Sequence, residues 1–299
     1  MLTLGIKAGD EVITTPLSAA ATTLAITAVG AKPVFVDINP DTYNIDVGKI
    51  KAKITKKTQA ILPVHLFGQP AAMSAILKIA KKYKLKVIED ACQAHGAKHQ
   101  GKIAGTFGEV GCFSFYPSKN LSAFGDGGCL ITNNKNLAEK AKILRDYGQK
   151  DRFQHQVLGL NSRLDEIQAA ILNVKLKYLN RWNSQRRQLA QIYEKLLKDL
   201  PLVLPKEQPA CFHIYHLYVL CTKRRNQLCK YLKTKGIQTQ IHYPLPLYNQ
   251  PAFRFLKVNR KEFPMVEKIT KEILSLPLYP ELKETEVKFI AKEIRKFFK

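Results

Sequence analysis

The first half of the chain alternates short apolar runs with stretches in which apolar residues recur at helical spacing. Continuous apolar runs are typical of strands buried on both faces, whereas a helix that covers such a sheet has an apolar residue every three or four positions. The alternation predicts an α/β fold in which helices cover a mostly parallel central sheet. The predicted strands span 11–14, 33–37, 59–65, 86–90, 111–115 and 128–132, and the predicted helices span 18–29 and 73–83.

Helical patterns become more frequent after about residue 133. One long helix is predicted over 165–182, with Asp165 and Glu166 in its first turn, where the helix dipole favours carboxylates. Its buried face is expected to carry the apolar residues that recur at helical spacing, namely Ile167, Ala170, Ile171, Val174 and Leu179.

The C-terminal part mixes helices with short strands and contains no internal repeat. We therefore expect a large domain over 1–185 and a smaller C-terminal α+β domain over 186–299. The further predicted helices span 136–147, 186–200, 224–235 and 284–298, and the further predicted strands span 215–221 and 236–241.

Basic residues outnumber acidic ones, because Lys plus Arg is 48 and Asp plus Glu is 24, which gives a formal charge of +24. Such a charge suggests a nucleic-acid partner. However, the lysines are scattered over the polar faces of predicted helices, with no basic tail or zinc-finger spacing. We keep nucleic acid only as an alternative partner. No membrane partner is expected, because no apolar window approaches the ~18 residues that a membrane helix needs.

The six cysteines include no Cys-x-x-Cys pair, and Cys92, Cys112 and Cys129 each lie within an apolar stretch. This spacing favours neither a metal site nor a disulfide framework. We interpret the cysteines as reduced, mostly buried thiols of a cytoplasmic protein that holds no metal.

Asp90 is the first candidate for chemistry, because it ends the apolar strand predicted over 86–90. In open α/β sheets, ligands bind beyond the carboxyl ends of the strands. An isolated aspartate in this position also commonly ends a strand or caps the next helix.

Lys119 is the second candidate, because it follows an apolar strand and has small or apolar neighbours on both sides. Burial favours the neutral amine, which is the form that makes a Schiff base with an aldehyde. Ser114 could offer its hydroxyl to an anion. The alternative is a lysine whose charged end reaches solvent. Together, a strand-end acid and a lysine in a turn are the two groups that pyridoxal phosphate needs.

The chain resembles the DegT/DnrJ/EryC1/StrS family of pyridoxal-phosphate-dependent sugar-nucleotide aminotransferases along its whole length. Several separate motifs in the right order make this resemblance more specific than one short pattern. The matching segments are GDEVIT at 9–14, GAKPVFVD at 30–37, PVHLFGQ at 63–69, EDACQAHG at 89–96, CFSFYPSKN at 112–120, GLNSRLDEIQ at 159–168, IHYP at 241–244 and LPLYP at 276–280.

The resemblance implies a fold type I transferase and assigns roles to matching residues. Lys119 would be the catalytic Schiff-base lysine and proton shuttle, Asp90 the partner of the pyridinium nitrogen, and Gln93 the residue beside the phenolic oxygen. Ser114 would bind the cofactor phosphate. His65 and His95 are expected only to pack.

The resemblance also implies a homodimer in which Asn161 and Arg163 reach the partner's cofactor. The alternative for these two is that they cap the long helix. His242 and Tyr243 would lie near the sugar nucleotide, although His242 is also compatible with a structural turn. The implied activity moves an amino group from glutamate to a nucleotide-linked keto sugar in two ping-pong half-reactions.

The chain departs from the family pattern in two places. The family has a Gly-Thr phosphate-binding turn and helix upstream of the GDEV motif, whereas this sequence begins at Met1, so a truncated, non-catalytic or regulatory relative is the alternative expectation. The segment after Pro16 often supplies a ring that stacks on the cofactor, but here 17–22 reads LSAAAT.

Overall fold

The computed structural model describes all residues from 1 to 299 and contains a six-stranded sheet with helices on both sides. Its strands are parallel apart from the last one at the edge, which pairs antiparallel. The predicted α/β fold with a mostly parallel sheet is confirmed. In spatial order the strands are β2 (Lys32–Phe35), β1 (Glu11–Thr14), β3 (Thr58–Ile61), β4 (Lys86–Asp90), β7 (Val110–Ser114) and β8 (Gly128–Ile131).

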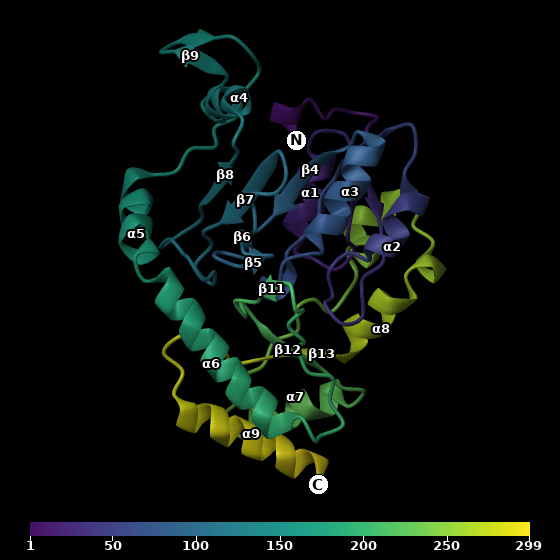
Figure 1. Cartoon of the computed structure of the whole chain (residues 1–299), viewed down its shortest axis with the longest axis vertical. Coiled ribbons are helices and arrows are strands. Elements are labelled where there is room, and N and C mark those ends of the chain that lie inside the picture. Colours follow the sequence, from purple (N-terminus) through teal and green to yellow (C-terminus); the bar gives the residue numbers. More distant parts are fainter.

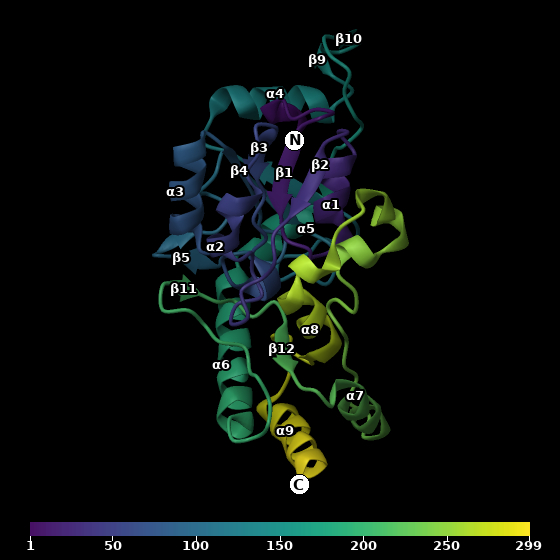
Figure 2. The ribbon, with the colours of Figure 1, turned by 90° about the vertical axis from the view of Figure 1, so that its right-hand side faces the viewer.

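The two faces of the sheet bury different side chains, because successive residues of a strand point to opposite faces. Ile13 and Val87 belong to a core that also holds Ile76 of α3 (Met73–Tyr83). Val12 and Ile88 belong to the opposite core, which holds Ile26 of α1 (Ala20–Thr27). Helices α1 and α3 therefore cover opposite faces, as Figure 2 shows. The short helix α2 (Val47–Ile50) lies near α3.

The C-terminal elements form a second core of 18 buried residues. Helix α6 packs against α9, and the antiparallel pair of β12 and β13 lies beside them (Figure 1). The domain boundary predicted at residue 185 falls inside α6, and this division of the chain stays a prediction. The elements of this core are α6 (Leu179–Leu197), β12 (Tyr218–Cys221), α7 (Arg225–Thr234), β13 (Ile273–Leu276) and α9 (Glu284–Phe298). Helix α8 (Pro264–Glu272) instead packs into the core that holds Ile26.

A tight contact joins the C-terminal elements to the sheet domain. Gly68 has a φ of +102°, and a Cβ on it would lie 2.7 Å from the backbone nitrogen of His216. The Gly68 carbonyl accepts a hydrogen bond of 3.0 Å from the Ile214 amide. Only glycine permits this approach without strain, so the loop after β3 and the segment before β12 are held together.

An arm formed by residues 147–164 extends from the body of the molecule (Figure 1). It carries several exposed apolar side chains, including Phe153, which is 77% exposed, and Leu158, which is 98% exposed. The arm lies between α4 (Lys135–Arg145) and α5 (Glu166–Leu176) and contains β9 (Gln149–Asp151) and β10 (Gln154–His155). Three further two-residue strands, β5 (Lys98–His99), β6 (Lys102–Ile103) and β11 (Cys211–Phe212), form a small separate sheet.

Four predictions about local structure were wrong. The single helix predicted over 165–182 is two helices, since α5 ends at Leu176 and α6 begins at Leu179. The helix predicted to start at residue 186 is therefore part of α6 and starts at Leu179. The face of the 165–182 helix that was predicted to be buried is largely exposed: Ile167 is 69% exposed and Val174 57% exposed. The strand predicted over 236–241 forms only one isolated bridge, between Gln240 and Ser275. The cysteines are not mostly buried, because only Cys221 is fully buried. Cys129 is exposed on the edge strand β8.

Candidate active site

Asp90 ends β4 and lies on the α1 face of the sheet, because the alternation of the strand gives it the same side as Ile88. The carboxylate is half-buried and is held by two donors. The Thr22 hydroxyl donates to Oδ2 over 2.7 Å, and the Cys92 amide donates to Oδ1 over 3.2 Å. The carboxylate is thus fixed in orientation while part of it stays accessible.

Lys119 follows β7 in a turn that is closed by a hydrogen bond of 2.9 Å from its own amide to the Tyr116 carbonyl. Its side chain is half-buried. Burial lowers the pKa of Lys119, and the nearby Cys92 and Asp90 oppose that shift. Lys119 and Asp90 therefore lie close enough for their charges to interact, and burial shifts the lysine toward its neutral form.

Gln93 links three loops around this site. Its Oε1 accepts a hydrogen bond of 2.7 Å from the Phe67 amide, and its Nε2 donates to the Tyr243 hydroxyl over 3.1 Å. Burial raises the pKa of Tyr243 to about 12; the Gln93 hydrogen bond opposes this shift and the charge of Asp90 adds to it. Tyr243, which is 150 positions away from Gln93 in the sequence, therefore lies beside Gln93 and Asp90.

His242 also lies at this site, where its Nδ1 is 2.8 Å from the Ser275 hydroxyl. Burial lowers the pKa of His242, and the charge of Lys119 lowers it further. Ser114 is half-buried on β7, and its hydroxyl accepts a hydrogen bond of 3.3 Å from the Tyr116 amide. Both residues thus belong to the surroundings of Lys119.

Asn161 and Arg163 are not brought to Asp90 and Lys119 within this chain. Both lie exposed at the base of the arm, where Asn161 forms a backbone bridge with Asp146. The Arg163 guanidinium is 3.8 Å from the Asp146 carboxylate and lies over the Tyr147 ring. Their roles at a cofactor stay predictions.

Beneath the site, Glu89 is fully buried on the other face of β4. Its carboxylate accepts hydrogen bonds from His65 Nε2 and from the backbone amides of Gly105, Phe107 and Gly108, at 2.6–2.9 Å. Burial alone would raise the pKa of Glu89, but the His65 hydrogen bond and the amides hold it below its usual value. Glu89 therefore fixes the strand end that carries Asp90.

Sequence reasoning missed Ser18, Thr22, Asn120 and His216, all of which are buried around this site. A signal existed for the first two. They lie four positions apart, on one face of the predicted helix that follows the strand over 11–14, and the end of that strand lies at the same sheet edge as Asp90. Asn120 ends the CFSFYPSKN segment next to Lys119, but no pattern in the sequence gave it or His216 a role.

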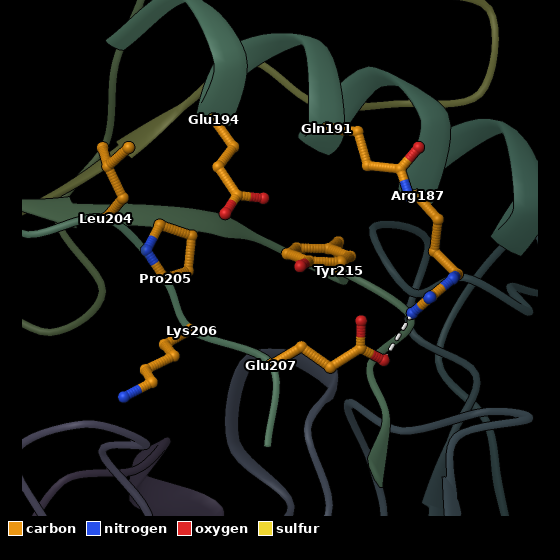
Figure 3. A pocket seen from close by; sticks show the side chains of 8 residues that line it. All are labelled: Arg187, Gln191, Glu194, Leu204, Pro205, Lys206, Glu207 and Tyr215. Carbon is orange, nitrogen blue, oxygen red and sulfur yellow. Dashed lines mark hydrogen bonds and ion pairs between the residues drawn. The ribbon is translucent and has the colours of Figure 1, made fainter. Parts of the chain in front are cut away.

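A separate hollow of about 430 Å³ lies between α6 and the segment 204–207 (Figure 3). Arg187 and Glu207 form an ion pair of 2.7 Å at its side, and the Tyr215 ring lies in it. None of the predicted site residues lines this hollow. We therefore place the candidate active site at Asp90 and Lys119.

The residues at Asp90 and Lys119 fit pyridoxal phosphate. A lysine with a lowered pKa suits an aldehyde, and a carboxylate held by two donors suits a ring nitrogen. No helix of the structure is both long enough and apolar enough to cross a membrane.

Comparison with known proteins relates these residues to one family. The DegT/DnrJ/EryC1/StrS aminotransferase family matches residues 1–295. The chain is 49% identical over 298 residues to a "Pleiotropic regulatory protein" of Geobacillus stearothermophilus, covering 99% of this chain and 80% of the relative. It is 45% identical to a dTDP-3-amino-3,6-dideoxy-alpha-D-galactopyranose transaminase of Aneurinibacillus thermoaerophilus, covering 99% and 82%.

The fold matches a crystal structure of S. venezuelae DesV in complex with a ketimine intermediate, with a TM-score of 0.97 and 40% sequence identity. That match covers 100% of this chain and 81% of DesV.

Proposed function

The chain belongs to the DegT/DnrJ/EryC1/StrS aminotransferase family, and from this premise we propose that it aminates a nucleotide-linked keto sugar with glutamate as the donor. The family depends on pyridoxal phosphate, and the chain is a transaminase of that type. The proposal adds the donor, the keto-sugar acceptor and a ping-pong order of half-reactions.

One observation carries this proposal: Lys119 has a lowered pKa in a half-buried position that it shares with Asp90. When bound, pyridoxal phosphate supplies an electrophilic aldehyde and an electron-withdrawing ring. Lys119 would hold the cofactor through its amine, and the same amine would accept the proton that leaves the Cα of the amino donor and pass it to the cofactor carbon that carries the aldehyde. Asp90 holds the proton at the ring nitrogen, which stabilises negative charge that develops in the transition state.

The other predicted residues have supporting roles. Ser114 binds the phosphate and Gln93 lies beside the phenolic oxygen, where the Tyr243 hydrogen bond orients its amide. His242 and Tyr243 contact the sugar nucleotide from the C-terminal part of the chain. Both have their pKa shifted toward the neutral form by burial, which suits hydrogen bonding to sugar hydroxyls.

An absorbance experiment tests the first half-reaction. The purified chain is mixed with pyridoxal phosphate, and the spectrum is recorded before and after glutamate is added. We expect a visible band that glutamate abolishes and that a keto acid restores. Lys119→Ala should give no such band. The matched control is Lys175→Arg, because burial also lowers the pKa of Lys175 but the proposal gives it no role. A band that survives in Lys119→Ala would refute the assignment.

We further propose a homodimer that shares its active sites. The arm and α5 expose the large apolar side chains of Phe153, Leu158 and Ile167, and exposed apolar surface of this kind marks contacts with another protein. Arg163 lies at the base of this surface. In a homodimer it would point toward the partner's cofactor, which explains why this chain alone does not bring it to Lys119.

A regulatory function is the second candidate, because the relative that is 49% identical carries the name of a regulatory protein. The same spectra separate the two candidates. Binding of pyridoxal phosphate without any response to glutamate or other amino acids would favour the regulatory function.

A further inference from the structure

The buried hydroxyl groups of Ser18 and Thr22 form a hydrogen-bonded chain that ends at the Asp90 carboxylate. Ser18 and Thr22 are 2% and 4% exposed. The Ser18 and Thr22 hydroxyl oxygens are 2.7 Å apart, and the Thr22 oxygen is 2.7 Å from Asp90 Oδ2. An ionised carboxylate can only accept, so Thr22 uses its single proton for Asp90 and Ser18 must donate to Thr22. The direction of both hydrogen bonds is therefore fixed.

These hydrogen bonds restrict the orientation of the Asp90 carboxylate. Oδ1 is held by the Cys92 amide and Oδ2 by Thr22. Rotation of the carboxylate about its Cβ–Cγ bond would break both hydrogen bonds. A carboxylate has about four acceptor positions, so two are used inside the protein and the others stay available on the half-buried side. Hydrogen bonds to charged groups are also stronger than neutral ones.

We propose that Ser18 and Thr22 are positioning residues that aim the Asp90 carboxylate at the ring nitrogen of the cofactor. The inference rests on the proposed function, in which Asp90 meets that nitrogen. It gives a role to the 17–22 segment, which has no aromatic ring: this segment supplies hydroxyls to the acid beside the ring. Thr22 acts on Asp90 directly, and Ser18 acts through Thr22.

Matched substitutions at Thr22 test the proposal. Thr22→Val keeps the shape of the side chain and removes the hydroxyl, whereas Thr22→Ser keeps the hydroxyl and removes a methyl group. The dissociation constant of pyridoxal phosphate is measured by absorbance titration, and thermal unfolding of the cofactor-free variants checks their folding. We expect Thr22→Val to raise the dissociation constant about tenfold and to change the bound cofactor's spectrum. Thr22→Ser should stay within about twofold of the natural chain, and Ser18→Ala should weaken binding about threefold.

A cofactor analogue separates positioning from packing. In 1-deazapyridoxal phosphate a C–H group replaces the ring nitrogen, so its binding gains nothing from an aimed carboxylate. We expect the natural chain and Thr22→Val to bind this analogue equally. If Thr22→Val raised the dissociation constants of both compounds equally, Thr22 would only shape the pocket. Unchanged binding of pyridoxal phosphate by Thr22→Val would also overturn the inference. If the natural chain itself bound neither compound, the proposed function would fail together with the inference.

Discussion

His216 donates a hydrogen bond of 2.9 Å from Nδ1 to the side-chain oxygen of Asn120, the residue after Lys119. Asn120 in turn donates to the Asn183 oxygen over 2.8 Å, and Asn183 donates to the His95 carbonyl over 2.8 Å. Because these residues come from different segments, the hydrogen bonds tie the turn of Lys119 to α6 and to the segment before β12. The position of the lysine thus depends on the C-terminal part of the chain.

Replacing Asn120 with leucine should destabilise the protein and weaken cofactor binding. The change leaves the His216 donor and the Asn183 acceptor buried without partners, each at a cost of about 1–3 kcal/mol. We expect a lower free energy of unfolding in urea and a higher dissociation constant for pyridoxal phosphate. His216→Asn is the control, because an asparagine amide keeps a donor near the position of Nδ1. If His216→Asn lowers the free energy of unfolding as much as Asn120→Leu does, the loss of this hydrogen bond does not explain the destabilisation.

Glu89→Gln should lower the free energy of unfolding by about 2–4 kcal/mol, as expected when a buried hydrogen-bonded charge is removed. The glutamine amide would place donors against the amides of Gly105, Phe107 and Gly108, which now donate to a carboxylate. Urea denaturation measures the change. Glu139→Gln on the exposed surface of α4 is the comparison, and it should differ from the natural chain by less than about 0.5 kcal/mol.

Stability should fall as the pH drops below the ordinary pKa of histidine, partly because of His95. Its ring packs against the rings of Phe113 and Phe115, and neither ring nitrogen has a side-chain hydrogen-bond partner. Burial, helped by the charge of Lys119, lowers the pKa of His95 to about 4 from 6.5. Between these pH values the unfolded chain binds a proton that the folded chain does not, so stability rises with pH.

The pH dependence of unfolding therefore gives a direct test. His95→Leu should reduce the slope of unfolding free energy against pH by up to about 1.4 kcal/mol per unit in this window. Urea denaturation at several pH values measures it. His213 and His216, whose pKa values burial also lowers, should keep part of the slope in the variant. An unchanged slope would mean that the pKa of His95 is the same in the folded and the unfolded chain.

Mixing two inactive variants tests the shared active site of the proposed homodimer. Lys119→Ala and Arg163→Ala should each lose most activity as homodimers. If Arg163 serves the partner's cofactor, a mixed dimer has one site with both defects and one intact site. Co-expression of the two should then restore up to about half of the activity per mixed dimer, as the symmetry of a two-fold dimer requires. Co-expression of Arg163→Ala with the natural chain is the control, because it shows how much activity a dimer with one defective subunit retains. No recovery in the mixed dimer would contradict the shared site.

The sequence by itself determined the mostly parallel sheet covered by helices and the membership in a transaminase family. The strand over 86–90 and the helices over 73–83 and 284–298 occur as predicted, because continuous apolar runs and helical spacing are local patterns. The same locality explains the failures. Nothing between Leu176 and Leu179 resembles a helix breaker, so the division of α5 from α6 was invisible. The apolar stripe over Ile167 and Val174 predicted burial, but burial needs a neighbour that the chain does not itself place there.

Only the tertiary structure decided what surrounds each candidate residue. Asp90 was predictable as an acid at a strand end, but Thr22 lies 68 positions away from it in the sequence. Their contact exists because β1 and β4 belong to one parallel sheet, whose carboxyl ends meet at one edge and whose alternation turns Asp90 toward α1. Hydrogen bonds between such distant side chains follow from the pairing order of strands. Residue patterns indicate which segments form strands. Which strands lie next to each other in the sheet is decided by the packing of the whole chain.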